Sequence, residues 1–216
     1  MRNALPVMPW EAHLGLSHAM IARFLGLATL ALLTLLAMVL CRDISWLEFG
    51  FRRAKGAWLR FAGGALLLGA VSTLVLKWSG GGGLDAAMAG VSPVELALLL
   101  VLATCVEELF VRGWIQGFLA PLRANKIELF GFEASTPVVI CALAFGSMHL
   151  SLTLAEIDAF TIVCVLSFTT LLGLLAGLAR ERTGSLMPAI GTHLAGNVGG
   201  IVGGIAYAIA TGAVRH

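Results

Sequence analysis

The chain has 216 residues, of which 59% are hydrophobic and 12% are charged, and its formal net charge is +2. Soluble domains contain roughly 45–50% apolar and about 25% charged residues, so this chain lacks the charge to cover a surface in water. Disordered chains are poor in apolar residues and are excluded too. A mean hydropathy of +0.95 agrees, and the composition predicts an integral membrane protein. The small net charge, without basic runs interleaved with aromatics, argues against nucleic acid as a partner.

Six apolar stretches are candidate membrane spans, since a helix needs about 20 residues to cross the hydrocarbon core. The fourth is short, and the third begins at Ser92-Pro93, a cap residue followed by proline. The sequence therefore predicts an all-α, polytopic transmembrane helix bundle of about six spans. They are approximately Ala22–Cys41, Arg60–Trp78, Ser92–Leu119, Pro137–Leu152, Ile157–Ala179 and Leu186–Thr211. A flexible joint is expected at Gly80–Gly83, and a tight turn is expected at Arg180–Ser185.

Basic residues predict the orientation, because cytoplasmic loops carry an excess of lysine and arginine. With six spans, one side holds nine of them and the other side holds four. The nine are Arg42, Arg52, Arg53, Lys55, Arg60, Arg123, Lys126, Arg180 and Arg182, and the four are Arg2, Arg23, Lys77 and Arg215. This bias predicts a multi-pass protein of the cell membrane with both termini outside and the Arg180 turn in the cytoplasm.

The last span is rich in glycine at a spacing of four residues, as in the pairs Gly196/Gly200 and Gly199/Gly203. Such small-xxx-small pairs let helix backbones approach closely in lipid. We expect them to pack inside the bundle, with homodimerisation as the alternative; the oligomeric state stays open. The four cysteines lie far apart without metal-ligand spacing and are expected to be buried apolar side chains.

Charged residues interrupt the third span, where ionisable groups are costly and therefore informative. Glu108 and Arg112 lie four residues apart on one helical face, in the order that favours an ion pair. Glu107 lies about 100° around the helix and cannot share that arginine equally. A carboxylate without a fixed partner in a poorly solvated site suits a general acid or base.

Two further spans carry polar groups at similar depth. His149 follows Phe145 by four residues in the fourth span, and Asn197 follows His193 by four in the sixth. At 1.5 Å per residue, Glu107 lies about 21 Å from the outer end of its helix at Pro93. Measured from the cytoplasmic side, His149 lies about 18 Å from Pro137 and His193 about 12 Å from Ser185. These depths are compatible, so we expect one polar cluster around a water-accessible pocket. Any one of these residues alone fits a structural role, but six together favour a site.

These motifs resemble those of a known family. Glu107-Glu108-xxx-Arg112, Phe145-xxx-His149 and His193-xxx-Asn197 are similar to the three motifs of the CPBP intramembrane glutamic proteases, also called the CAAX-protease and bacteriocin-processing (Abi) family. The similarity covers about residues 93–200. It implies a division into an N-terminal pair of spans with a basic loop, residues 1–92, and a catalytic helix core, residues 93–216.

The resemblance also implies roles in peptide-bond hydrolysis without a cofactor or metal. Glu107 would be the base and His149 would help to hold and polarise the water. Glu108 would pair with Arg112 and fix the site, and His193 and Asn197 would stabilise the oxyanion. Spacing alone does not decide which glutamate is the base. The substrate would be a membrane-anchored or lipidated protein: a prenylated tail, a bacteriocin leader or a C-terminal sorting tail.

Other mechanisms stay open. His149, His193 and a glutamate could together hold a catalytic zinc ion, although HExxH is absent, as are the Gly-x-Ser-Gly and Gly-x-Gly-Asp motifs of other intramembrane proteases. A proton-coupled transporter or a scaffold could use the same carboxylates. Transporters usually show repeated halves with broken helices, which this sequence lacks.

Overall fold

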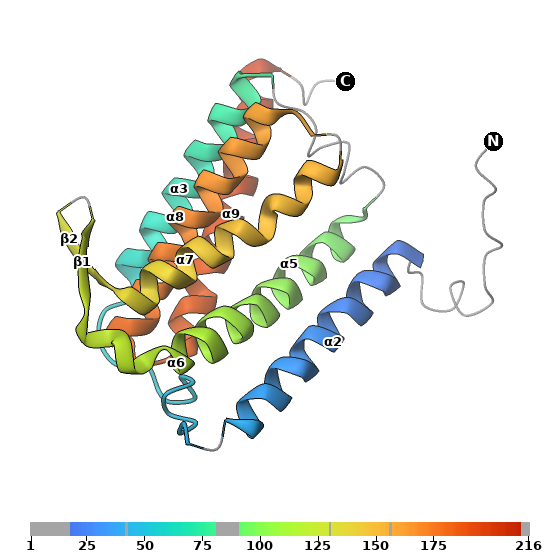
Figure 1. The fold of residues 1–216 in the computed structure, drawn as a ribbon. Helices are drawn as coiled ribbons and strands as arrows, with labels where there is room; N and C mark the ends of the chain where they lie inside the picture. The colour runs from blue at the N-terminus through green and yellow to red at the C-terminus, as the bar shows by residue number, and fades with distance from the viewer. Residues whose placement is uncertain (1–17, 42, 81–90, 130, 156, 213–216) are drawn as a thin grey trace.

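The structure is a bundle of long helices, described in a computed structural model for residues 18–41, 43–80, 91–129, 131–155 and 157–212 (Figure 1). Five of its helical segments are long and apolar enough to cross a membrane, which confirms the all-α transmembrane class. The helices are α2 (His18–Leu40), α3 (Leu59–Trp78), α5 (Pro93–Glu108), α7 (Thr136–Met148), α8 (Ala159–Thr183) and α9 (Leu186–Thr211). The joint predicted at Gly80–Gly83 lies, apart from Gly80, outside the described residues.

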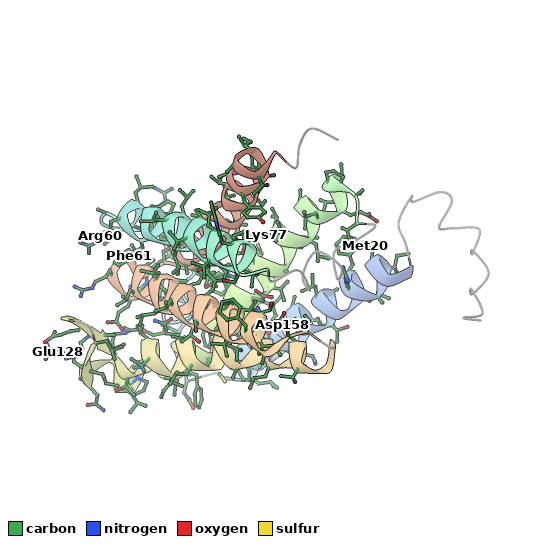
Figure 2. All side chains as sticks on the ribbon, turned by 90° about the horizontal axis from the view of Figure 1, so that it is seen from above. Met20, Arg60, Phe61, Lys77, Glu128 and Asp158 are labelled. Carbon is green, nitrogen blue, oxygen red and sulfur yellow. The ribbon has the colours of Figure 1, made fainter. Side chains whose placement is uncertain are left out.

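The helices pack around α8 and α9. Helix α3 lies along α9, α8 contacts both α7 and α9, and α2 packs at the edge of the bundle against α5 (Figure 1). Outward-facing side chains such as Leu32, Val75 and Ile209 are exposed in this bundle, as a lipid-facing surface requires. Figure 2 shows Arg60 and Glu128 at one end of the bundle and Lys77 and Asp158 at the other.

The glycines of α9 form its contact with α3. A Cβ atom on Gly199 would lie 2.0 Å from the carbonyl oxygen of Leu66, and one on Gly69 of α3 would lie 2.1 Å from that of Gly196. Only glycine permits backbones this close. The expectation that these residues pack inside the bundle is confirmed.

The third span differs from the expected single α-helix. Its start is as predicted: the Ser92 hydroxyl accepts from the Glu95 N–H at 3.2 Å, and the Glu95 carboxylate accepts from the Ser92 N–H at 2.9 Å. After Glu108, however, the backbone becomes a π-helix, η1 (Leu109–Ile115), followed by the short α6 (Gln116–Phe118). The α-helical part alone has 16 residues, so this span is missing from the five that meet the membrane criterion.

The predicted turn at Arg180–Ser185 is wrong in its extent. Helix α8 continues to Thr183 and ends at Gly184, which has a φ of +71° as helix-ending glycines commonly do. Arg180 is therefore a helical residue; it is 2% exposed and donates to the Glu48 carbonyl at 2.6 Å. Arg180 was counted among the nine basic residues that predicted the orientation, but it is buried in α8 and is not a loop charge.

The fourth span is short, as predicted, but it changes form at the histidine. Helix α7 ends at Met148, and the 3-10 helix η3 (His149–Ala155) extends it. Before α7 lie two unpredicted elements, the 3-10 helix η2 (Ala120–Ala124) and an antiparallel hairpin of β1 (Lys126–Leu129) and β2 (Phe132–Ser135). Figure 1 places the hairpin, the segment after α2 and the α8–α9 turn at the same end of the bundle.

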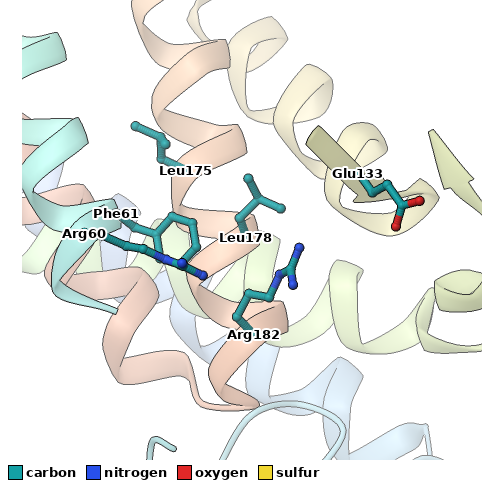
Figure 3. Close-up of a pocket in the computed structure, with 6 residues that line it drawn as sticks. All are labelled: Arg60, Phe61, Glu133, Leu175, Leu178 and Arg182. Atoms are coloured by element: carbon teal, nitrogen blue, oxygen red, sulfur yellow. The ribbon is translucent and has the colours of Figure 1, made fainter. Parts of the chain in front are cut away.

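The hairpin is fixed to the bundle through α8. Glu181 forms an ion pair with Lys126 at 3.0 Å and a hydrogen bond with Ser135. Beside the hairpin, a hollow of about 300 Å³ opens between α3, α8 and β2 (Figure 3). Its lining residues are Arg60, Phe61, Glu133, Leu175, Leu178 and Arg182.

Candidate active site

A buried ion pair lies where α5 becomes the π-helix. Arg112 Nη1 is 2.8 Å from Glu108 Oε1, and both side chains are 0% exposed, which confirms the pair expected from the spacing. The other end of the guanidinium donates to the Gly173 carbonyl at 3.0 Å. A Cβ on Gly173 would lie 3.0 Å from Arg112 Nη2 and 3.1 Å from the Cα of Ala142, so glycine leaves room for the arginine between α7 and α8.

His193 of α9 binds the same carboxylate. Its Nδ1 is 2.8 Å from Glu108 Oε1, the oxygen that already accepts from Arg112. Because this oxygen accepts both bonds, the histidine carries a proton on Nδ1. The ring is thereby oriented so that Nε2 faces Glu107 Oε2 at 3.9 Å, which is too long for a direct hydrogen bond.

The two adjacent glutamates differ in exposure and in partners. The Glu108 side chain is 0% exposed and is held by two donors, whereas that of Glu107 is 24% exposed. The geometry gives Glu108 a fixed structural position and leaves Glu107 accessible.

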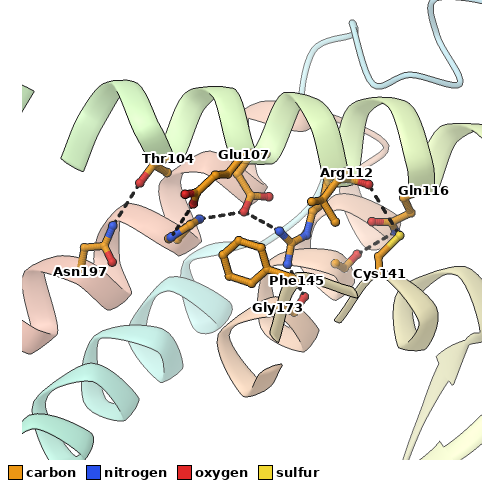
Figure 4. Close-up of polar contacts among 12 residues, drawn as sticks. Thr104, Glu107, Arg112, Gln116, Cys141, Phe145, Gly173 and Asn197 are labelled. Atoms are coloured by element: carbon orange, nitrogen blue, oxygen red, sulfur yellow. Dashed lines mark hydrogen bonds and ion pairs between the residues drawn. The ribbon is translucent and has the colours of Figure 1, made fainter. Parts of the chain in front are cut away.

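Asn197 of α9 joins the cluster through a residue that the sequence did not single out. Its Nδ2 donates to the hydroxyl of Thr104 at 3.0 Å, and Thr104 is 1% exposed. Thr104 lies three residues before Glu107 and so close to the same side of α5 (Figure 4). The sequence feature that could have pointed to Thr104 is a hydroxyl residue three positions before a charged pair in an otherwise apolar helix.

Phe145 of α7 packs against several of these groups (Figure 4). Its ring centroid is 5.2 Å from that of His193 and 5.3 Å from that of His149, and the Arg112 guanidinium carbon lies 4.5 Å from it. The motif position of this residue therefore has a structural reason: one ring contacts the guanidinium and both imidazoles.

His149 reaches the cluster through that ring. Its Nδ1 lies 3.1 Å from the Phe145 carbonyl oxygen, which only accepts, so Nδ1 donates and Nε2 is the nitrogen left for other partners. Among the described residues His149 has no hydrogen bond or ion pair with either glutamate. The structure thus brings Glu107, Glu108, Arg112 and His193 into direct contact and holds His149 beside them.

Two other polar side chains, also absent from the expected set, extend the network away from Glu107. Gln116 donates to the Gly177 carbonyl at 3.2 Å, and the Cys141 thiol lies 3.6 Å from the Val111 carbonyl. All four cysteines are free; Cys141 is buried as expected, whereas Cys41, Cys105 and Cys164 are only partly buried. Within the described part of the chain, no three His, Cys, Asp or Glu side chains are grouped so that they could hold a metal ion.

Comparison with known proteins identifies the family. The model of the family described as type II CAAX prenyl endopeptidase Rce1-like matches residues 89–199, just over half of the chain, and all six expected site residues lie in this range. Curated proteins and solved structures give no match. This chain belongs to the Rce1-like family of type II CAAX prenyl endopeptidases, and it is accordingly a membrane peptidase whose family acts on membrane-anchored substrates.

Proposed function

We propose that the protein is a glutamic-type intramembrane endopeptidase in which Glu107 activates the water that hydrolyses the peptide bond. The observation that carries the assignment is the contrast between the neighbouring carboxylates: Glu107 is 24% exposed, and Glu108 is fully buried between Arg112 and His193. A base must reach both water and the substrate carbonyl. Glu108 reaches neither without losing its partners.

In the proposed reaction, Glu107 takes a proton from water while the water oxygen attacks the carbonyl carbon. Charge then develops on the carbonyl oxygen, and two groups supply donors for it. His193 presents Nε2 beside Glu107, and Asn197 has a second amide hydrogen besides the one given to Thr104. Glu107 returns its proton to the leaving amine as the tetrahedral intermediate breaks down, so the enzyme ends in its starting state.

Glu108 and His149 have supporting roles in this proposal. Glu108 accepts from Nδ1 of His193 and so fixes the ring with Nε2 towards Glu107; a donor at Nε2 requires a proton on that nitrogen as well. His149 offers Nε2 as an acceptor for the water, since Nδ1 is bound to the Phe145 carbonyl. Oriented donors to the oxyanion, the role proposed for His193 and Asn197, stabilise the transition state by roughly 3–4 kcal/mol each in a site that excludes bulk water.

We propose a membrane-anchored or lipidated protein as the substrate, cleaved by an enzyme of the cell membrane. The test is a comparison of protein termini in membranes from cells that hold the wild-type protein, Glu107→Gln or no copy. A precursor with an uncleaved anchor should accumulate equally in the last two. Normal processing with Glu107→Gln would show that the Glu107 carboxylate is not the base.

A further inference from the structure

The hollow beside the hairpin has charged side chains at its outer end and apolar side chains deeper in the bundle. Arg60 is the second residue of α3 and Arg182 is the second-last residue of α8, so both guanidiniums lie at the end of the bundle that carries the hairpin. Leu178 and Leu175 lie about one and two turns further into the bundle along α8. Figure 3 shows the arginines on either side of this apolar wall. The charged mouth matches the headgroup of a phospholipid, and the apolar wall matches its acyl chains.

The charge at the mouth is positive and available. Arg60 and Arg182 are exposed, and neither forms an ion pair with another described residue; Arg60 instead lies 4.8 Å from the centre of the Phe61 ring. Glu133, also exposed, is the one carboxylate in the lining. Two guanidiniums against one carboxylate favour an anion, and guanidinium matches the geometry of phosphate oxygens.

The position in the bilayer agrees with this chemistry. The hollow lies at the end of the bundle with the excess of basic residues, the side predicted to face the cytoplasm. Anionic lipids are concentrated in that leaflet, and basic pockets between membrane helices bind their headgroups. The hollow shares no lining residue with the cluster of Glu107 and His193, so it is a separate site.

We infer that this hollow is a binding site for an anionic glycerophospholipid. The phosphate lies between Arg60 and Arg182, and an acyl chain follows Phe61, Leu178 and Leu175 into the membrane. A zwitterionic lipid fits the same apolar wall but brings a cationic group to a mouth that already has an excess of positive charge. The site therefore selects by headgroup charge.

The experiment counts retained lipids. The full-length protein is reconstituted in an equimolar mixture of phosphatidylglycerol and phosphatidylcholine, extracted in mild detergent and weighed by native mass spectrometry. Wild type should retain one phosphatidylglycerol in preference to phosphatidylcholine. Arg60→Gln and Arg182→Gln should each lower that preference about fivefold, since a basic residue near an anionic surface has an effect of this size. Arg53→Gln with Lys55→Gln is the control, because it removes exposed charge from the same end outside the hollow.

A variant that should raise lipid retention distinguishes a binding effect from misfolding, because a misfolded protein would only lose lipid. Glu133→Gln removes the carboxylate from the mouth and should raise retention of phosphatidylglycerol. Equal retention of both lipids by wild type would overturn the proposal. So would a preference that survives Arg60→Gln and Arg182→Gln together, or one that falls as much in the Arg53 and Lys55 control.

Discussion

One oxygen atom of Glu108 accepts hydrogen bonds from both Arg112 and His193, each at 2.8 Å. Glu108 and His193 are 85 residues apart in the sequence, so this contact joins α5 to α9 and fixes the direction of the imidazole. The carboxylate is neutralised by the arginine and oriented by the same bond. Its neighbour Glu107, one residue earlier, is left to face Nε2 of that imidazole.

The two glutamates should respond differently to the same substitution. Glu107→Gln, nearly isosteric, should abolish cleavage and leave the melting temperature unchanged, because it removes only an ionisable group. Glu108→Gln should lower both activity and melting temperature, because it leaves Arg112 as a buried unpaired charge. Reporter cleavage and thermal unfolding in detergent measure the pair. Near wild-type cleavage by Glu107→Gln would transfer the role of base to Glu108.

Arg112→Ala should destabilise the protein by about 3–5 kcal/mol, because Glu108 then stays buried without its cation. Arg112→Lys should recover only part of this loss, since one ammonium group cannot reach both Glu108 and the Gly173 carbonyl as the guanidinium does. The control is Lys126→Ala, whose pair with Glu181 is partly exposed and whose loss should cost less than about 1 kcal/mol. If Arg112→Ala and Lys126→Ala unfolded at the same temperature, the central ion pair would not be buried.

The contact between α3 and α9 predicts that glycine is required at position 199 but not at position 204 of the same helix. Gly199→Ala would place a methyl group against the Leu66 carbonyl, and the helices would have to separate at a cost of about 1–3 kcal/mol. Gly204→Ala is the matched control on the same helix, because its nearest neighbour is a Thr73 methyl at 3.9 Å. Melting temperatures in one detergent compare the two. Equal tolerance would contradict the close approach of these backbones.

Thr104 is expected to position Asn197 without touching the substrate. Thr104→Val removes the hydroxyl at nearly constant volume and should lower kcat about tenfold with little change in KM, because an oxyanion donor acts in the transition state. Thr104→Ser restores the hydroxyl and should recover most of the rate. A rise in KM alone, or failure of serine to rescue, would show that Thr104 acts by packing.

Metal removal separates the proposed mechanism from the zinc alternative. His193 Nδ1 is bound to Glu108, and no metal-holding group occurs among the described side chains. Dialysis against phenanthroline should therefore leave the cleavage rate of the purified enzyme unchanged. A loss of activity that added zinc restores would replace the glutamate-activated water with a metal-bound one.

The sequence by itself determined the class of the protein, its family motifs and one ion pair of the candidate site. Composition and apolar run length are local properties, so they predicted a membrane helix bundle and placed α9 at Leu186–Thr211, as observed. The pair of Glu108 and Arg112 followed from a spacing of four residues within one helical segment. Motif order gave the family, since it needs no knowledge of how the helices pack.

Only the tertiary structure decided which groups of different helices meet. The bonds of His193 to Glu108 and of Asn197 to Thr104 depend on how α9 packs against α5, and neither helix carries this information alone. Arg180, which lies inside α8, donates to the Glu48 carbonyl, 132 residues away in the chain. A sequence shows the desolvation cost of a charged residue in an apolar helix. It does not show the partner from another element that offsets this cost.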